Sequence, residues 1–190
     1  MKTETTSPDF QNTDTSNRFL TLFEPDRLIV LDGAMGTMIQ KAGLPLLRHP
    51  ERNNVLFPEV IEGIHRQYIE AGANVIYANT FGASPDRFQD EPESYEVIIQ
   101  QAVALARNAA AGTSSKVALD LGPLGILMEP IGSVTFDEAY AQFTAMVKAG
   151  ASAGADLIVI ETMSDLAEAR AALLAAKENS SLPVAVTMTF

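Results

Sequence analysis

The stretch Leu157-Ile158-Val159-Ile160-Glu161-Thr162 is a run of four aliphatic residues that ends in a carboxylate and a hydroxyl. Three other apolar runs end in the same way: 28–31 before Asp32, 75–78 before Asn79, and 117–119 before Asp120. Continuous apolar runs are typical of parallel strands that helices bury on both faces. Polar residues at the carboxyl ends of such strands are where α/β proteins bind ligands. The sequence therefore predicts a parallel sheet and the edge that carries its site.

Between these runs, four segments show apolar residues at helical spacing. Each begins near a proline or a capping residue, namely Pro58, Pro92, Thr135 and Asp165. A fifth strand is expected over 184–188. Five strands alternating with four helices predict an α/β protein.

A short internal repeat is consistent with a barrel built from successive βα modules. Ala71-Gly72-Ala73-Asn74-Val75-Ile76 matches Ala153-Gly154-Ala155-Asp156-Leu157-Ile158, and the glycine of each copy suits a left-handed helix end. Successive βα modules build the TIM (β/α)8 barrel, which takes about 250 residues. An open doubly wound sheet would fit 190 residues, but the segment after Asp32 lacks the spacing of a dinucleotide-binding fingerprint. We therefore expect about the first five strands and four helices of a barrel, truncated after strand 5.

Composition narrows the function classes. The net charge of −11 argues against nucleic acid and anionic membranes as partners. No apolar run approaches the length of a membrane span, and the N-terminus lacks a signal-peptide core. Cysteine is absent, which suggests a cytoplasmic protein. Residues 1–18 are polar and predict a disordered tail, which leaves 19–190 as the folded unit.

Five motifs in order resemble the homocysteine S-methyltransferase family. They are Leu31-Asp32-Gly33-Ala34-Met35-Gly36-Thr37, Asn79-Thr80-Phe81-Gly82-Ala83 after the first repeat, Asp120-Leu121-Gly122-Pro123-Leu124-Gly125, Ile160-Glu161-Thr162-Met163-Ser164-Asp165 and Thr187-Met188-Thr189-Phe190. The resemblance covers about residues 27–190. It implies the N-terminal part of a homocysteine-binding (β/α)8 barrel and a transferase of methionine biosynthesis and one-carbon metabolism.

The resemblance also implies cofactors. The family holds zinc on three cysteines of later strands, and zinc converts the homocysteine thiol into the nucleophilic thiolate. This sequence has no cysteine, so we expect no metal ligand here and no activity from this chain alone. The continuation Met38-Ile39-Gln40 resembles the cobalamin-dependent members, which implies methylcobalamin as methyl donor and separate cobalamin and folate modules as partners.

The resemblance implies a substrate-binding role for the polar strand ends. The implied set is Asp32, Gly33, Ala34, Asn79, Thr80, Phe81, Asp120 and Glu161, with Asp32 and Glu161 near the homocysteine ammonium. Each has a structural alternative. Asp32-Gly33 and Asp120 could belong to turns, Glu161 could be a paired core carboxylate, and Asn79 and Thr80 could satisfy loop backbone groups.

Several further interpretations remain open at this point. His49 and His65 are isolated in the sequence and are interpreted as structural or solvent-facing residues. The rival function is a non-catalytic small-molecule-binding or split-subunit module that needs a partner chain, such as the C-terminal half of the barrel. An unrelated barrel enzyme is a third possibility. In a chain that carries only part of a barrel, the strands at 28–31 and 184–188 would lack a neighbour and would be edges prone to association.

Overall fold

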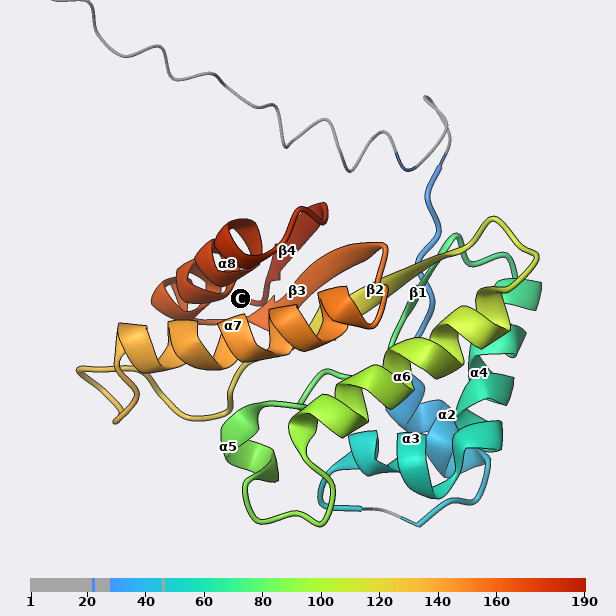
Figure 1. Cartoon of the computed structure of the whole chain (residues 1–190), viewed down its shortest axis with the longest axis horizontal. Helices are drawn as coiled ribbons and strands as arrows, with labels where there is room; N and C mark the ends of the chain where they lie inside the picture. The colour runs from blue at the N-terminus through green and yellow to red at the C-terminus, as the bar shows by residue number, and fades with distance from the viewer. Residues whose placement is uncertain (1–21, 23–27, 46) are drawn as a thin grey trace, which may run out of the picture.

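The computed structural model describes residues 22, 28–45 and 47–190, and the predicted tail at 1–18 lies outside these ranges. Its centre is a four-stranded parallel sheet in the order β1-β2-β3-β4 (Figure 1). The strands are β1 (Val75–Tyr77), β2 (Lys116–Leu121), β3 (Leu157–Met163) and β4 (Val184–Met188). Each strand pairs with the next one in the sequence, as βα modules require. The predicted α/β class with a parallel sheet is confirmed.

The predicted first strand at 28–31 is wrong as a strand. This segment makes one isolated parallel bridge, Leu31 with Val75, and the Asp32 N–H donates to the Val75 carbonyl at 3.0 Å. Leu28 is 82% exposed, so the segment lies beside β1 without burying a full strand. The apolar pattern predicted a full strand here, but strand formation depends on neighbouring strands and packing, and the structure gives this segment a single bridge.

The described part of the chain contains four long helices and several shorter ones. The four long helices match the predicted segments: α4 (Pro58–Glu70), α6 (Tyr95–Ala110), α7 (Phe136–Ser152) and α8 (Leu166–Asn179). The short elements are α2 (Met35–Lys41), η1 (Pro50–Arg52), α3 (Asn53–Leu56) and α5 (Pro85–Phe88), which the sequence analysis did not predict. Within the described ranges, none of the helices has the length and apolar character that crossing a bilayer requires.

The starts of two helices follow the predicted capping chemistry. Thr135 and Glu138 form the reciprocal capping box, with the Glu138 N–H donating to Thr135 Oγ1 at 3.2 Å. Asp165 Oδ1 accepts from the N–H groups of Ala167 and Glu168 at the start of α8. Leu166, the first residue of α8, is 75% exposed and lies outside the core, although its apolar side chain fits the helical pattern.

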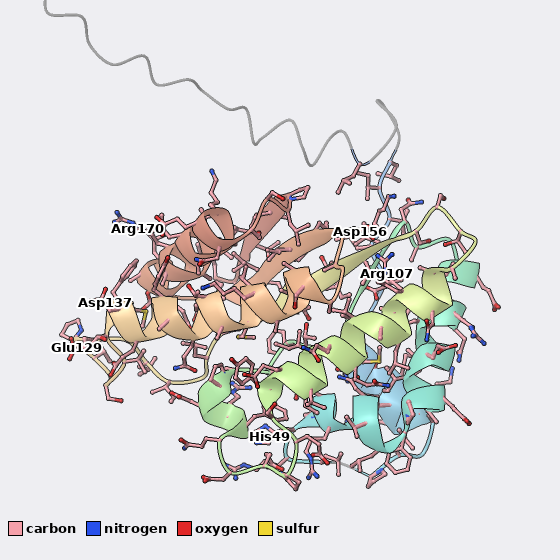
Figure 2. All side chains as sticks on the ribbon, viewed as in Figure 1. His49, Arg107, Glu129, Asp137, Asp156 and Arg170 are labelled. Carbon is pink, nitrogen blue, oxygen red and sulfur yellow. The ribbon has the colours of Figure 1, made fainter. Side chains whose placement is uncertain are left out.

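In each copy of the internal repeat, one side chain accepts a hydrogen bond from the backbone of the neighbouring extended segment. The Asn74 side chain accepts from the Val30 N–H at 2.9 Å, and the Asp156 side chain accepts from the Val117 N–H at 2.9 Å. In each copy the repeat residue's own N–H donates back to the same neighbour's carbonyl, so two bonds fix the strand register. Figure 2 shows Arg107 beside Asp156, and the Arg107 guanidinium also donates to the Gly154 carbonyl at 2.7 Å.

Alternate residues of each strand face two different environments. One face packs against α6, α7 and α8 and forms the large core, with Leu119, Leu121, Ile158 and Ile160 fully buried. The opposite, inner face carries a smaller apolar cluster of Val75, Ala118, Leu157 and Val159. The next inner-face positions along the strands are Tyr77, Asp120 and Glu161, so the inner face changes from apolar to polar toward the carboxyl ends.

A β-bulge shapes the end of β3. Ile160 pairs with Val186 and Met163 with Met188, so three steps on β3 oppose two on β4. The extra residue lets Ile160 and Met163 both enter the helix-side core. Thr162 has a φ of 59°, a left-handed conformation that is costly for a β-branched residue. This strain lies directly beside Glu161, at the edge of the sheet where the site was predicted.

Candidate functional site

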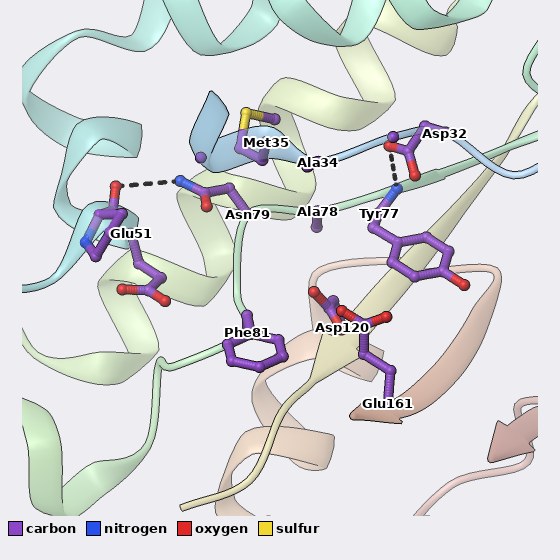
Figure 3. A pocket seen from close by; sticks show the side chains of 13 residues that line it. Asp32, Ala34, Met35, Glu51, Tyr77, Ala78, Asn79, Phe81, Asp120 and Glu161 are labelled. Carbon is purple, nitrogen blue, oxygen red and sulfur yellow. Dashed lines mark hydrogen bonds between the residues drawn. The ribbon is translucent and has the colours of Figure 1, made fainter. Parts of the chain in front are cut away.

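A cavity of about 460 Å³ opens at the carboxyl ends of the strands (Figure 3). Its walls come from the segment after Leu31, from η1, and from the ends of β1, β2 and β3. Seven of the eight predicted residues line it: Asp32, Gly33, Ala34, Asn79, Phe81, Asp120 and Glu161. The structure therefore brings together strand ends that lie far apart in the sequence, from Asp32 near the first helix to Glu161 at the end of β3.

Thr80 is the predicted residue that does not line the cavity. It is fully buried, and its hydroxyl donates to the Asp120 carbonyl at 2.7 Å. The same hydroxyl oxygen accepts from the Asp120 N–H at 3.1 Å. Thr80 thus ties the turn after β1 to the end of β2, which is the backbone-satisfying alternative that the sequence left open.

Asp32 is fixed at the cavity by the neighbouring strand. Its Oδ2 accepts from the Tyr77 N–H at 2.9 Å, which leaves Oδ1 available to a ligand. Burial raises the pKa of Asp32 from 3.8 to about 7, against the lowering effect of the Tyr77 N–H, and the charge of Glu161 raises it further. Asp32 therefore changes charge near neutral pH and resists full ionisation unless a cation arrives.

Asp120 and Glu161 lie next to each other at the ends of β2 and β3 (Figure 3). Burial raises the pKa of Asp120 well above its usual range, and the charges of Glu161, Asp32 and Glu51 raise it further. Burial also raises the pKa of Glu161. The Asp120 Oδ1 is buried and has no hydrogen-bond partner among the described residues. These carboxylates repel one another in a sheltered site, and a positively charged ligand would relieve that repulsion.

The opposite wall of the cavity is held by amides and by an aromatic ring. Asn79 Nδ2 donates to Asn54 Oδ1 at 3.0 Å and to the Pro50 carbonyl at 3.3 Å. Asn54 Nδ2 returns a bond to the Asn79 carbonyl at 2.8 Å. The Phe81 ring packs on Gly122, where an added methyl group would lie 2.5 Å from the ring. Gly122 therefore permits the ring to take its place in the wall.

Sequence reasoning missed several residues of the cavity. The most important are Glu51 and Tyr77, and Met35, Gly36, Pro50 and Ala78 also line it. Tyr77 could have been found, because it is the inner-face residue two positions after Val75. Glu51 lies in η1, outside any strand end, so neither strand periodicity nor a motif pointed to it.

The two histidines lie away from the cavity walls. His65 is fully buried in α4, where burial lowers its pKa to about 4. His49 is buried, with its Nε2 3.6 Å from a Glu91 carboxylate oxygen and its ring centroid 5.1 Å from that of Phe88. These surroundings agree with the structural interpretation of both residues.

The residues present do not fit the zinc that the family resemblance implies. The sequence has no cysteine, and the described part of the chain holds no cluster of three His, Asp or Glu side chains arranged around a metal position. We therefore derive no chemical step through a metal from this chain.

Comparison with known proteins adds to this geometry. A family model described as homocysteine S-methyltransferase matches residues 29–190. The chain belongs to the homocysteine S-methyltransferase family. The chain is also 32% identical over 163 residues to methionine synthase of Mycobacterium tuberculosis (strain ATCC 25618 / H37Rv), and 31% identical over 164 residues to methionine synthase of Mycobacterium leprae (strain TN). Each alignment covers 80% of this chain and 14% of the relative.

Solved structures of the homocysteine methyltransferase MmuM from Escherichia coli share the fold. The metallated form gives a TM-score of 0.75 at 25% identity, over 90% of this chain and 65% of that one. The oxidised form gives a TM-score of 0.79 at 23% identity, over 93% of this chain and 66% of that one, which bears on the fold alone. The chain thus spans about a seventh of the methionine synthases and about two thirds of the Escherichia coli protein.

Proposed function

We propose that this chain forms the homocysteine-binding part of a methyltransferase that converts homocysteine to methionine. The observation that carries the proposal is the convergence of Asp32, Asp120 and Glu161 on one cavity in a member of this family. We further propose that the sheet is the first part of a (β/α)8 barrel and that the cavity holds the amino-acid end of the substrate.

The chemistry of the cavity suits an α-ammonium group. Asp32 Oδ1 and the Glu161 carboxylate are available as charged acceptors, and a carboxylate–ammonium hydrogen bond in a sheltered site is stronger than a neutral one. Burial raises the pKa of Asp32 and Asp120, and repulsion between the carboxylates raises both further, so a bound ammonium would favour their ionised forms. The role of these side chains is to bind and orient the substrate so that its thiol is presented elsewhere.

Activation of the thiol is assigned to groups outside this sequence. Because a free thiol is mostly protonated at neutral pH and the chain has no cysteine to hold zinc, we propose that the isolated chain binds substrate without methyl transfer. Zinc, methylcobalamin and the folate and cobalamin modules remain proposals for a complete enzyme, as does a cytoplasmic location.

A direct binding experiment tests the proposal. We expect isothermal titration calorimetry on the 190-residue chain to show L-homocysteine binding at least tenfold tighter than 4-mercaptobutanoate, which lacks only the ammonium group. The matched pair isolates the contribution of the carboxylates. Equal affinity for the two compounds, or no binding of homocysteine, would contradict the proposal.

The alternative of a module that needs a partner chain has its own support. Within the described residues β4 is the last strand of the sheet, and Val186 in it is 39% exposed. Exposed apolar strand edges promote association. We expect light scattering to show self-association of the chain that decreases when a second polypeptide with the later strands of a homocysteine methyltransferase is added. A monodisperse monomer unaffected by that polypeptide would count against the alternative.

A further inference from the structure

Two buried glutamates make the same kind of contact with a loop backbone. Glu51 Oε1 accepts from the Gly82 N–H at 2.7 Å, and Glu168 Oε1 accepts from the Leu124 N–H at 2.7 Å. Both residues are 5% exposed. A carboxylate that accepts from a backbone N–H in a sheltered place makes a strong, short bond. The two contacts differ in one respect, because Glu51 lines the cavity and Glu168 does not.

The turn at 79–82, whose Gly82 N–H donates to Glu51, forms part of the cavity wall. Asn79 and Phe81 precede Gly82 and both line the cavity. A methyl group at Gly82 would lie 2.7 Å from Glu51 Oε1 and 2.6 Å from Arg87 Nη1. A side chain at this position would therefore push the Glu51 and Arg87 side chains away from the turn. The position of the turn depends on close contact with Glu51.

The rest of the same segment makes further contacts with the turn. The Pro50 carbonyl and the Asn54 side chain both accept from Asn79 Nδ2, and Asn54 Nδ2 donates to the Asn79 carbonyl. Asn53 Nδ2 donates to the Pro50 carbonyl at 2.8 Å, which stiffens the segment itself. Residues 50–54 thus form a hydrogen-bonded segment to which the turn is attached.

The second carboxylate oxygen of Glu51 lacks a partner in the described part of the chain. Glu51 Oε2 is buried and has no hydrogen-bond partner among the described residues, and the same holds for Asp120 Oδ1. A buried carboxylate oxygen without a partner is costly, so packing alone would favour another residue at this position. Glu51 thus accepts a strong hydrogen bond from a backbone N–H and also places a carboxylate oxygen without a partner beside the cavity.

We propose that Glu51 is a positioning residue for the ligand: by holding the Gly82 N–H it sets the turn that places Asn79 and Phe81 in the cavity wall. This inference rests on the proposed homocysteine function for its ligand, but the hold on the turn is independent of which ligand binds. Asn79 and Phe81 would contact the substrate directly, and Glu51 acts through them.

The test compares Glu51→Ala, Glu51→Gln and Glu168→Ala in the full 190-residue chain. Hydrogen exchange of the Gly82 amide, followed by NMR, reports the hold on the turn without any ligand. Calorimetry with L-homocysteine reports its effect on binding. We expect Glu51→Ala to speed Gly82 exchange at least tenfold and to weaken homocysteine binding about tenfold. Glu51→Gln keeps an oxygen acceptor, so it should retain protection and an affinity within about threefold of the original chain.

Glu168→Ala is the matched control, because it removes an equally short and equally buried contact outside the cavity. It should lower the melting temperature to a similar extent as Glu51→Ala and leave homocysteine affinity within twofold. Unchanged Gly82 exchange in Glu51→Ala would overturn the proposal. So would a Glu51→Gln variant as weak in binding as Glu51→Ala, or a Glu168→Ala variant that loses affinity equally. If the original chain binds no homocysteine, the proposed function fails, and Gly82 exchange still decides the role of Glu51.

Discussion

The inner face of the sheet holds two layers with opposite chemistry. The layer toward the amino ends of the strands is apolar, formed by Val75, Ala118 and Leu157. The layer toward the carboxyl ends contains Tyr77, Asp120 and Glu161 on the same three strands. Backbone pairing between β1, β2 and β3 is parallel throughout, so the difference lies entirely in the side chains.

The apolar layer stabilises the fold, whereas the acidic layer has the properties of a ligand-binding surface. The apolar layer gains free energy by removing surface from water. The acidic layer does the opposite, because burial and mutual repulsion raise the pKa of Asp120, and burial raises that of Glu161. The strained Thr162 directly follows Glu161 of this layer. Unfavourable groups gathered at one strand end are expected where a ligand supplies the missing interaction.

The largest expected effect comes from placing an acid in the apolar layer. Ala118 is fully buried on the inner face, and Ala118→Asp would put a carboxylate there without a partner. We expect a loss of about 4 kcal/mol or more in the free energy of unfolding, enough to abolish cooperative folding. Urea denaturation followed by circular dichroism measures this. Ala167→Asp, the same substitution at an exposed position in the first turn of α8, is the control and should change stability by less than about 1 kcal/mol, since an acid is favourable near a helix N-terminus.

The second prediction concerns variants that remove one negative charge from the acidic layer. We expect Asp32→Asn and Glu161→Gln each to weaken homocysteine binding by about 1.5–3 kcal/mol, or roughly 10- to 150-fold, since each removes a charged acceptor for the ammonium. Asn at position 32 keeps an oxygen for the Tyr77 N–H, so the fold should persist. Calorimetry measures the affinity.

The stability of these variants provides an independent check. The folded-state pKa of Asp32 lies above its unfolded value, so its contribution to stability is present at low pH and is lost as pH rises through about 7. Asp32→Asn should therefore be more stable than the original chain at pH 8 and show little difference near pH 4. Asp90→Asn, the same substitution at an exposed turn after α5, should change neither affinity nor stability. A stability difference that is independent of pH would contradict the assignment.

Much of this organisation could be predicted from the sequence because it follows from local chemistry. The apolar runs located β1 to β4, and the caps at Thr135 and Asp165 located α7 and α8. The strand ends located Asp32, Asp120 and Glu161, since parallel strands bring their carboxyl ends to one edge. The repeat at Asn74 and Asp156 also has a common structural cause, the bond to the neighbouring strand.

The remaining features depend on tertiary contacts that one sequence does not reveal. Residues 28–31 have the composition of a strand, but pairing is decided by neighbours, and the structure gives them a single bridge. Glu51 lies in a 3₁₀ turn whose approach to Gly82, 31 residues away, is a matter of packing. The bulge at Thr162 similarly depends on how Ile160 and Met163 both fit the core. Positions such as these are set by the assembled molecule.

The third prediction concerns how homocysteine affinity depends on pH through the charge of Asp32. Because the pKa of Asp32 is about 7 and the ammonium needs the ionised carboxylate, protonation competes with binding. We expect homocysteine affinity to rise about tenfold between about pH 6 and pH 7.5 and to change little above that, as calorimetry across this range would show. Asp32→Asn should remove most of this dependence. A flat profile in the original chain would show that Asp32 is not the titrating contact.

The smallest expected effect comes from Gly122, which lies outside both layers but sets the shape of the acidic one. A methyl group there would lie 2.5 Å from the Phe81 ring, closer than real carbon contacts allow, so the ring must shift. Phe81 lines the cavity, so a shifted ring changes the shape of the cavity wall. We expect Gly122→Ala to weaken homocysteine binding about threefold, or about 0.7 kcal/mol. In a Phe81→Leu background the smaller side chain frees the space, so adding Gly122→Ala there should change affinity by less than twofold. If Gly122→Ala weakens binding threefold in that background as well, the effect does not act through the ring, and the contact between Phe81 and Gly122 does not shape the cavity.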